Sequence, residues 1–220
     1  MNLLLRYYSL NRLQLFMFIV SVNLVIIWLS KTVLINDIVF YNTYSEQLTY
    51  DRSLQLFEDM NRMSWIGYVF TPLMLIIKFT LVSLVLYTGI VICNIQDKVP
   101  LSSVVKIVIA SEVIFVFAGF IKFVWFYLFA GNYNLNDLGF FYPLSLINLF
   151  KVSEVTKLWV YPLQTFNLFH LLYIISMSHG LNKVCKIEKS DSDKVVLLSY
   201  LPALVIWIAL IMFLSVDTSL

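Results

Sequence analysis

The strongest constraint on the fold is a pair of long apolar segments between Pro72 and Phe129, joined by a short polar stretch from Asn94 to Pro100. A run of about 20 mostly apolar residues lets an α-helix cross the hydrocarbon of a bilayer, and each segment reaches that length. The two segments therefore predict a hairpin of membrane-spanning helices.

The composition agrees with a protein that resides in a bilayer. The chain is 60% hydrophobic and 13% charged, with a mean hydropathy of +0.86, whereas a soluble domain has about 45–50% apolar and about 25% charged residues. Its fifteen lysines and arginines are spread between the apolar runs, and the net charge is only +2. No basic patch therefore indicates nucleic-acid binding, and we expect the lipid bilayer as the surroundings.

Hydropathy along the chain predicts an all-α, polytopic transmembrane helical bundle of about five spans. Lys31 follows the first apolar run with no small-residue cleavage motif, so we expect an uncleaved first span and not a signal peptide. The expected parts are a short cytoplasmic N-terminus (1–12), the first span (13–34), a polar linker (35–64) and a four-span membrane domain (65–220). The spans of that domain are expected at about 72–93, 101–129, 159–177 and 195–214.

The start of the second span has two signals. Trp65 and Tyr68 lie where an aromatic belt at the membrane interface would place them. Pro72 suits a first helical turn, because its missing N–H is not needed there. We therefore expect this helix to begin at about Pro72.

The polar linker contains one amphipathic segment, Tyr50 to Met63. On a helical wheel of about 100 degrees per residue, its apolar and polar side chains occupy opposite halves. The polar half carries three acids and two arginines, which disfavours electrostatic binding to anionic lipid. We expect an interfacial helix that packs on its own protein or on a partner. The candidate partner-packing face consists of Tyr50, Leu54, Leu56, Phe57, Met60 and Met63.

Three ionisable side chains lie inside the predicted hairpin, where charge is costly and marks a candidate functional site. Glu112 is expected near mid-depth, where it must be protonated, paired or beside a wet cavity. Lys78 and Lys122 are expected near one interface, because a long side chain can carry its ammonium group back to water. With Asn94 and Leu101 taken at one depth, Lys78 lies about 24 Å and Glu112 about 16 Å along their helices, a depth difference of about 8 Å. Because side chains tilt toward the N-terminus of their helix, we expect Lys78 and Glu112 to point away from each other.

Two other polar residues lie inside predicted spans. Asn23 is expected to hydrogen-bond to another helix, with a stabilisation of about 1 kcal/mol. His170 lies in the fourth span, and its separation from His179 is a rotation of about 900 degrees, so the two face opposite sides of one helix and make a poor metal site. The candidate intramembrane polar site is therefore Glu112, His170 and Asn23.

No motif indicates an enzyme, a metal or a cofactor. Cys93 and Cys185 are too few for a disulfide framework and match no metal-ligand spacing. The chain lacks an HExxH pair, a GxSG-like serine with a helical histidine, and paired membrane aspartates. We therefore expect no catalytic residue, no bound metal and no cofactor.

The distribution of lysine and arginine predicts the orientation. With five spans, a cytoplasmic N-terminus puts seven of these residues inside and five outside, so the positive-inside preference favours this orientation with the C-terminus on the opposite side. Both cysteines then lie at the cytoplasmic side, where thiols stay reduced. We expect an integral protein of the bacterial inner (cytoplasmic) membrane.

The order of elements resembles a known family. An amphipathic linker precedes the hairpin TPLMLIIKFTLVSLVLYTGIVICN and VPLSSVVKIVIASEVIFVFAGF, after which come an apolar loop, NLFHLLYIISMSHGLNKVCKIEKSDSDK and a last span. Over about residues 60–215 this order resembles the Yip-domain family of five-span membrane proteins, whose eukaryotic members interact with Rab GTPases in secretory traffic. Those members have a substantial cytosolic N-terminal region, whereas about a dozen residues precede the first span here. The resemblance is therefore to a prokaryotic-type member and implies neither Rab binding nor catalytic residues.

Two functional hypotheses follow. The first is a non-enzymatic multi-pass protein that assembles with other membrane proteins, as a hetero- or homo-oligomer, and acts as an accessory subunit in secretion or membrane trafficking. Its basis is the amphipathic helix and the short apolar segment Gly139 to Phe150, which is expected to dip into or lie along the membrane. The alternative is a transporter or proton- or ion-conducting subunit, although no internal repeat or Gly-rich break is evident. That alternative rests on Glu112, Lys78, Lys122 and His170.

Overall fold

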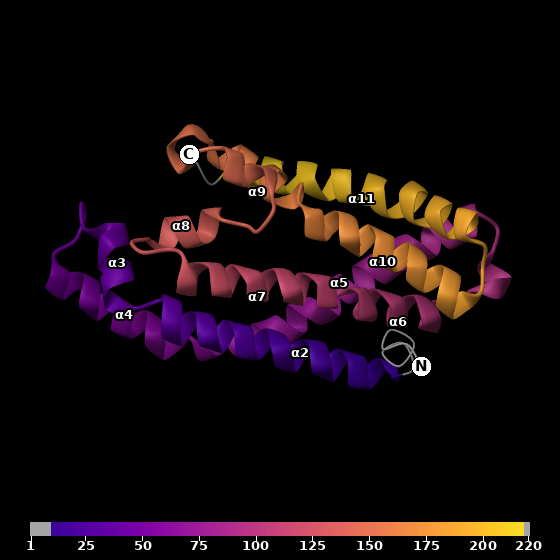
Figure 1. The fold of residues 1–220 in the computed structure, drawn as a ribbon, viewed down its shortest axis with the longest axis horizontal. Coiled ribbons are helices and arrows are strands. Elements are labelled where there is room, and N and C mark those ends of the chain that lie inside the picture. Colours follow the sequence, from indigo (N-terminus) through magenta and orange to yellow (C-terminus); the bar gives the residue numbers. More distant parts are fainter. Residues whose placement is uncertain (1–9, 218–220) are drawn as a thin grey trace.

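The computed structural model describes residues 10–217, and the regular elements of this part of the chain are all helices, with no β-strand (Figure 1). The predicted all-α class is confirmed for these residues. In chain order the elements are α2 (Arg12–Leu29), the π-helical turn η1 (Ser30–Leu34), α3 (Asp37–Tyr44), α4 (Tyr50–Met63), α5 (Trp65–Ile92), the 3₁₀ turn η2 (Gln96–Lys98), α6 (Leu101–Ser111), α7 (Val113–Leu128), α8 (Leu135–Phe140), the 3₁₀ turns η3 (Leu146–Leu149) and η4 (Val152–Glu154), α9 (Lys157–Thr165), α10 (Leu168–Cys185) and α11 (Lys189–Asp217).

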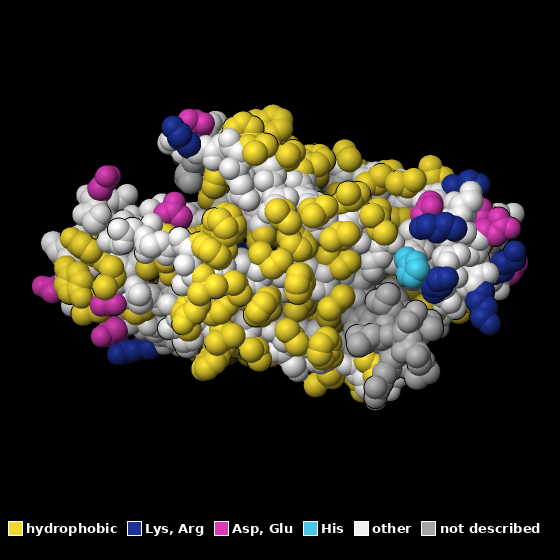
Figure 2. Space-filling view, viewed as in Figure 1, with side chains coloured by type: hydrophobic (Ala, Val, Ile, Leu, Met, Phe, Trp, Pro, Cys, Tyr) yellow, Lys and Arg dark blue, Asp and Glu magenta, His cyan; other side chains and the backbone are white. Residues whose placement is uncertain are grey.

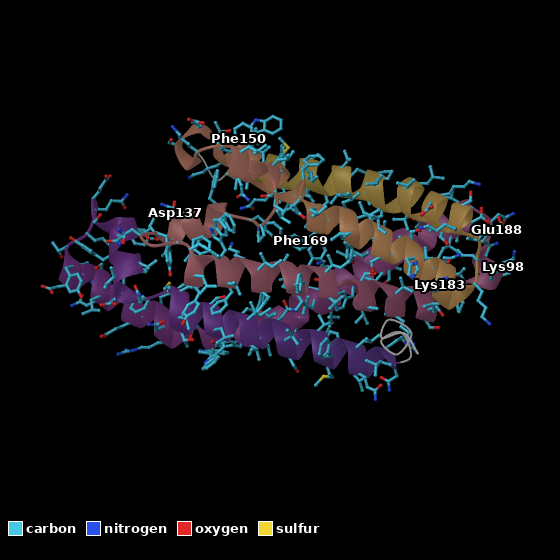
Figure 3. All side chains as sticks on the ribbon, in the orientation of Figure 1. Lys98, Asp137, Phe150, Phe169, Lys183 and Glu188 are labelled. Carbon is cyan, nitrogen blue, oxygen red and sulfur yellow. The ribbon has the colours of Figure 1, made fainter. Side chains whose placement is uncertain are left out.

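The long helices lie side by side along the long axis of the molecule (Figure 1). The connections between α5 and α6 and between α10 and α11 lie at one end, which we call the α5–α6 end. The helices α3, α4, α8 and α9 lie at the other, which we call the α9 end. Lys98, Lys183 and Glu188 mark the first end in Figure 3, and Asp137 and Phe150 lie toward the second.

Four helical segments are long and apolar enough to cross a membrane: Arg12–Leu34, Trp65–Ile92, Leu101–Leu128 and Lys189–Ser215. Figure 2 shows hydrophobic side chains over the middle of the molecule and charged side chains gathered at its two ends. An apolar band between two charged ends is what a bilayer requires of a protein that crosses it. The chain is therefore a membrane protein with four candidate spanning helices.

The predicted fourth span is the exception. The chain forms two shorter helices there, α9 and α10, which are separated by Phe166 and Asn167. The 18-residue α10 carries two histidines, an asparagine and a lysine, which lower its hydropathy. By helix length and hydropathy, the predicted number of five spans is therefore not confirmed. Nevertheless, α10 runs beside α11 within the bundle (Figure 1).

The second span begins earlier than its sequence predicts. Pro72 was expected in the first helical turn, but α5 starts at Trp65 and runs for 28 residues with Pro72 inside it. Thr71 Oγ1 hydrogen-bonds the Gly67 carbonyl oxygen in this turn, and the aromatic residues that suggested an interfacial belt are helical. At about 1.5 Å per residue, α5 is about 42 Å long and Lys78 lies at its midpoint.

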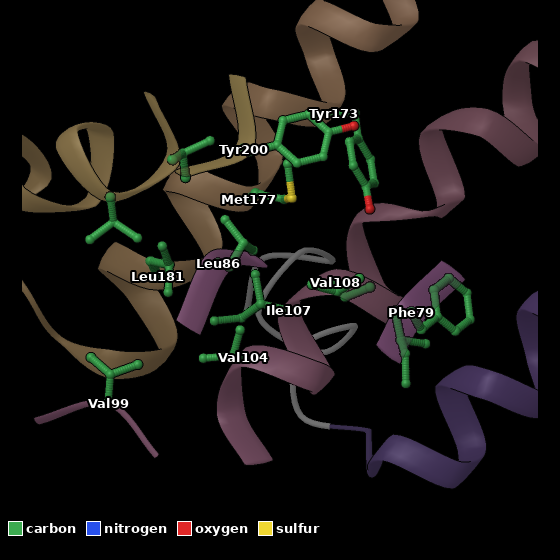
Figure 4. Packing of buried hydrophobic residues seen from close by; sticks show 14 of the residues in the cluster. Phe79, Leu86, Val99, Val104, Ile107, Val108, Tyr173, Met177, Leu181 and Tyr200 are labelled. Atoms are coloured by element: carbon green, nitrogen blue, oxygen red, sulfur yellow. The ribbon is translucent and has the colours of Figure 1, made fainter. Parts of the chain in front are cut away.

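The core lies between α5, α6, α10 and α11, toward the α5–α6 end. Its fully buried side chains are aliphatic, apart from Met177 and Tyr173 (Figure 4). The residues of this core with at most 1% exposure include Leu86, Ile90, Val99, Val104, Ile107, Val108, Met177, Leu181, Val195 and Val196.

The closest approach in this core is between α5 and α11 at Gly89. A Cβ atom on Gly89 would lie 2.7 Å from both Cβ and Oγ of Ser199 and 2.8 Å from the Val195 carbonyl oxygen. Small residues let helix backbones approach closely in membranes, where packing drives association. Gly89 therefore sets the separation of α5 and α11.

Replacing Gly89 with alanine should force these helices apart. We expect Gly89→Ala to lower the thermal stability of the detergent-solubilised protein, since overpacking costs about 1–3 kcal/mol. Gly67→Ala is the matched control in the same helix, because no atom lies within 4 Å of the added Cβ. The melting temperature of each variant is measured by heating the protein and running size-exclusion chromatography on what remains folded. A melting temperature of Gly89→Ala equal to that of the wild type would contradict the proposed contact.

Candidate functional site

The centre of the candidate site is an ion pair between Lys78 of α5 and Glu112 at the junction of α6 and α7. Lys78 Nζ lies 2.6 Å from Glu112 Oε1, and the side chains are 39% and 5% exposed. Both residues are far from the ends of 28-residue apolar segments. The structure thus pairs the mid-span acid with a mid-span base.

The prediction that Lys78 points to the interface and away from Glu112 is wrong. It placed Asn94 and Leu101 at one depth, but Val99 and Pro100 between them are extended. Two extended residues span about 7 Å, and Val99 is fully buried in the core. An offset of this size between Asn94 and Leu101 accounts for most of the depth difference expected between Lys78 and Glu112, and the flexible Lys78 side chain covers the rest.

The helix is interrupted at Glu112. Its amide donates to the Ile109 carbonyl oxygen at 3.2 Å, and its own carbonyl oxygen accepts from Phe115 N at 2.9 Å and from Val116 N at 3.2 Å. The bonds to Ile109 and from Phe115 span three residues and form a 3₁₀ turn, which inside a long helix often marks a functional hinge. Neither proline nor glycine lies at this position, so the interruption has no conventional signal in the sequence.

Aromatic side chains surround the ion pair. Lys78 Nζ lies 4.3 Å from the centroid of the Phe115 ring and 5.7 Å from that of Tyr173, distances at which a ring face attracts a cation. His170 Nε2 and Tyr200 Oη are hydrogen-bonded at 2.9 Å. We call Lys78, Glu112, Phe115, His170, Tyr173 and Tyr200 the mid-span cluster.

The rings join these residues into one cluster. Phe115 lies 5.3 Å from His170 and 4.8 Å from Tyr173, between ring centroids. Tyr173 and Tyr200 are separated by 5.8 Å. The cluster thus draws one or more residues from α5, α7, α10 and α11, together with the α6–α7 junction.

Two buried polar atoms in the cluster lack hydrogen-bond partners among the described residues: Glu112 Oε2 and Tyr173 Oη. A buried polar atom without a partner costs about 1–3 kcal/mol, so such atoms invite a functional explanation. The Glu112 charge interacts electrostatically with Tyr142, Tyr173 and Tyr200.

A second interruption, between α9 and α10, also lies near this cluster. Asn167 caps α10, since its Oδ1 accepts from His170 N at 2.7 Å. Leu146 N donates to the Phe166 carbonyl oxygen at 3.0 Å, and Leu168 N donates to that of Leu144 at 3.1 Å. The irregular segment 141–150 is therefore hydrogen-bonded to the start of α10.

The depth of this second interruption follows from α7. His170 contacts Phe115, which lies about 20 Å along α7 from Leu128 at about 1.5 Å per residue. The start of α10 is therefore well inside the span and not at its end. Irregular backbone at membrane depth is tolerated where it is buried in protein or lines a wet cavity, and Ser145 and Ile147 of segment 141–150 are buried.

The structure brings together two of the three residues in the predicted polar site. Glu112 and His170 both belong to the mid-span cluster, but Asn23 Nδ2 donates to the Ile19 carbonyl oxygen of its own helix at 2.9 Å, and this bond replaces the expected one to another helix. Lys122 is half-buried on α7, and no described residue forms an ion pair with it.

Tyr173 and Tyr200 were not predicted as site residues, because aromatic residues are common in any span. The one signal in the sequence was the three-residue spacing of His170 and Tyr173, which puts both on one face of a helix.

The described residues contain no group of three His, Cys, Asp or Glu side chains that could hold a metal ion. Cys93 and Cys185 are both free thiols. Within the part of the chain that the structure describes, the mid-span cluster offers paired charges and hydroxyl groups, which suit proton or ion chemistry.

A second candidate site is the hairpin of α3 and α4 at the α9 end. The predicted amphipathic helix Tyr50–Met63 coincides with α4. Phe57 packs against Phe40 at 5.6 Å, and Tyr50 against Tyr41 at 5.4 Å, between ring centroids. Tyr50 Oη also lies 3.3 Å from Asp37 Oδ2, and the negative charge of Asp37 raises the pKa of the Tyr50 phenol.

This hairpin covers only part of the predicted packing face. Leu54, Leu56 and Phe57 are half-buried, whereas Tyr50, Met60 and Met63 are 48%, 43% and 66% exposed. Two contacts with the segment before α8 hold α3 and the end of η1 in place. Tyr133 Oη donates to the Leu34 carbonyl oxygen at 2.9 Å, and Leu135 N donates to Thr43 Oγ1 at 2.9 Å.

No protein-family model, curated protein or solved structure matches the chain significantly. The resemblance to the Yip-domain family therefore stays a prediction from the order of elements.

Breaking the ion pair should destabilise the bundle. Removing one partner of a buried pair costs about 3–5 kcal/mol, so we expect Lys78→Met and Glu112→Gln each to lower the melting temperature in detergent. The double variant should lose less than the sum of the two, because it leaves no unpaired charge.

The exposed pair Lys194–Asp191, at 3.6 Å with side chains 61% and 39% exposed, provides the control. Lys194→Met should change stability by about 1 kcal/mol or less. Strictly additive losses for Lys78→Met and Glu112→Gln would show that the two side chains do not interact.

Proposed function

We propose that the protein is a non-enzymatic, multi-pass subunit of a membrane complex, with α10 as a fifth pass and α4 as the helix that contacts the partner. The observation that supports it most directly is the exposed apolar row Tyr50, Met60 and Met63 on α4. An amphipathic helix of an isolated protein normally buries such a row. Here Ser53 is the one buried residue of α4.

The partner proposed for this row is a protein and not anionic lipid. The opposite half of α4 is exposed and carries Asp51, Glu58 and Asp59 against Arg52 and Arg62, so its net charge is negative and does not favour an anionic membrane surface. An amphipathic helix fits an apolar groove on another protein, with the methionines adapting to its shape. Basic side chains at the rim of that groove would complement the acids.

The proposed fifth pass, α10, sets the positions of the chain ends. With α10 crossing beside α11, α2 begins at the α5–α6 end and α11 terminates at the α9 end (Figure 1). Under the orientation predicted from lysine and arginine, the α5–α6 end is cytoplasmic and α4 meets its partner on the opposite side. The inner membrane of a bacterium is the proposed location.

Negative charge on the exposed apolar row of α4 should release the partner protein. We expect the double substitution Met60→Glu with Met63→Glu to abolish co-purification of the partner from native membranes in gentle detergent, followed by mass spectrometry. Gln55→Glu adds a negative charge to the polar half of the same helix and should leave the complex intact. A wild-type protein that migrates as a monomer on blue-native gels and brings down no partner would contradict the proposal.

A second candidate function is supported by a separate observation. Two helix interruptions, at Glu112 and at Phe166–Asn167, converge on the ion pair, and discontinuous helices near the membrane midplane form the ion sites of many transporters. Toward the α5–α6 end, however, the cluster is followed by the tightly packed aliphatic core (Figure 4). Transport would therefore require this core to open.

A further inference from the structure

The groups around Glu112 differ between the two ends of the molecule. Toward the α9 end lie His170 and Tyr200, which share a hydrogen bond and can carry a proton, and the hydroxyl of Tyr161, which accepts a hydrogen bond from Trp207 Nε1 at 2.8 Å. Toward the α5–α6 end, the Ser176–Ser111 hydrogen bond is followed by aliphatic side chains that are almost completely buried, among them Leu86, Ile107 and Leu181. Titratable side chains among the described residues thus approach Glu112 from the α9 end, and access for protons is one-sided.

From this asymmetry, we propose that Glu112 is a proton-binding site that exchanges with the α9 end through His170, Tyr200 and Tyr173. The buried Oε2 atom is free to accept the proton, since Oε1 already contacts Lys78. The Tyr173 ring lies 6.4 Å from that of His170 and 5.8 Å from that of Tyr200, between centroids, and its centroid is 5.7 Å from Lys78 Nζ. The buried Tyr173 hydroxyl lacks a hydrogen-bond partner among the described residues, so it is available as a link between the His170–Tyr200 pair and Glu112.

The proton balance of this step is simple. One proton from water at the α9 end adds to the Glu112 carboxylate and gives a neutral carboxylic acid, while Lys78 keeps its ammonium proton. The cluster changes from net zero to one positive charge. The ion pair between α5 and the α6–α7 junction is then lost, and the 3₁₀ turn at Glu112 is positioned to respond.

The titratable groups that face Glu112 come from each packed element. They are Lys78 on α5, His170 and Tyr173 on α10, Tyr200 on α11, and Tyr142 in segment 141–150. The one ionisable residue of α2 is Arg12, at its first position and so far from mid-span. Proton binding is independent of the proposed assembly through α4, which lies at the α9 end.

Infrared difference spectroscopy of the full-length protein in liposomes tests proton binding directly. As the pH is lowered, we expect the wild type to gain a C=O stretch of a neutral carboxylic acid that is missing from the difference spectrum of Glu112→Gln, in which the other Asp and Glu residues still contribute. Asp193→Asn, at a charged pair near the start of α11, should retain the band. If the C=O stretch that depends on Glu112 is present at every pH measured, or absent at every pH, the proposal is overturned.

A pH jump with time-resolved infrared detection tests the route. We expect the double substitution His170→Phe with Tyr200→Phe to slow the appearance of the band at least tenfold. Ser176→Ala, which removes the 3.0 Å hydrogen bond to Ser111 on the other side of the cluster, should leave the rate unchanged. An equal rate in wild type and the His170–Tyr200 variant, or a comparable slowing by Ser176→Ala, would overturn one-sided access.

Discussion

The Lys78–Glu112 ion pair is the interaction on which the middle of this bundle depends. A charge in hydrocarbon is costly, and a lone carboxylate at mid-span would have to be neutralised or removed from the interior. Pairing with Lys78 lets the acid remain 5% exposed at the α6–α7 junction. The same pair ties α5 to that junction, while Gly89 brings α5 against α11. Together these contacts fix three of the four candidate spans around the cluster.

Much of the fold follows from hydropathy and helical periodicity. The all-α class, the apolar hairpin, the start of α6 at Leu101 and the bounds of α4 were all predicted. The start of α5 was not, because Pro72 is acceptable in a first turn and the aromatic residues before it resembled an interfacial belt. Similarly, the interruption before α10 was missed, since its cause is the hydrogen bonding of segment 141–150 to residues 166–168, which are close in space and distant in sequence.

The candidate site likewise contains residues that were predicted from the sequence and residues that depend on contacts between distant parts of the chain. Glu112 and His170 were predicted from the cost of polar groups in a span, which is a local property of the sequence. That Lys78 is the partner of Glu112 depends on the relative depth of two helices, and two extended residues at Val99 and Pro100 were enough to alter it. The roles of Tyr173 and Tyr200 depend on packing between α10 and α11, for which a hydropathy profile has no signal.

The two proposals assign separate roles to the two candidate sites. We propose that α4 contacts a partner and that the mid-span cluster binds a proton. Solid-state NMR of the protein in bilayers, with ¹⁵N-lysine and ¹³C-glutamate labels, tests the ion pair itself. We predict a strong dipolar coupling between Lys78 Nζ and Glu112 Cδ that disappears in Lys78→Met, while any weaker signal from the exposed Lys151–Glu154 pair, at 4.0 Å, remains. Identical lysine–glutamate couplings in the wild type and Lys78→Met would contradict the ion pair and the cluster built around it.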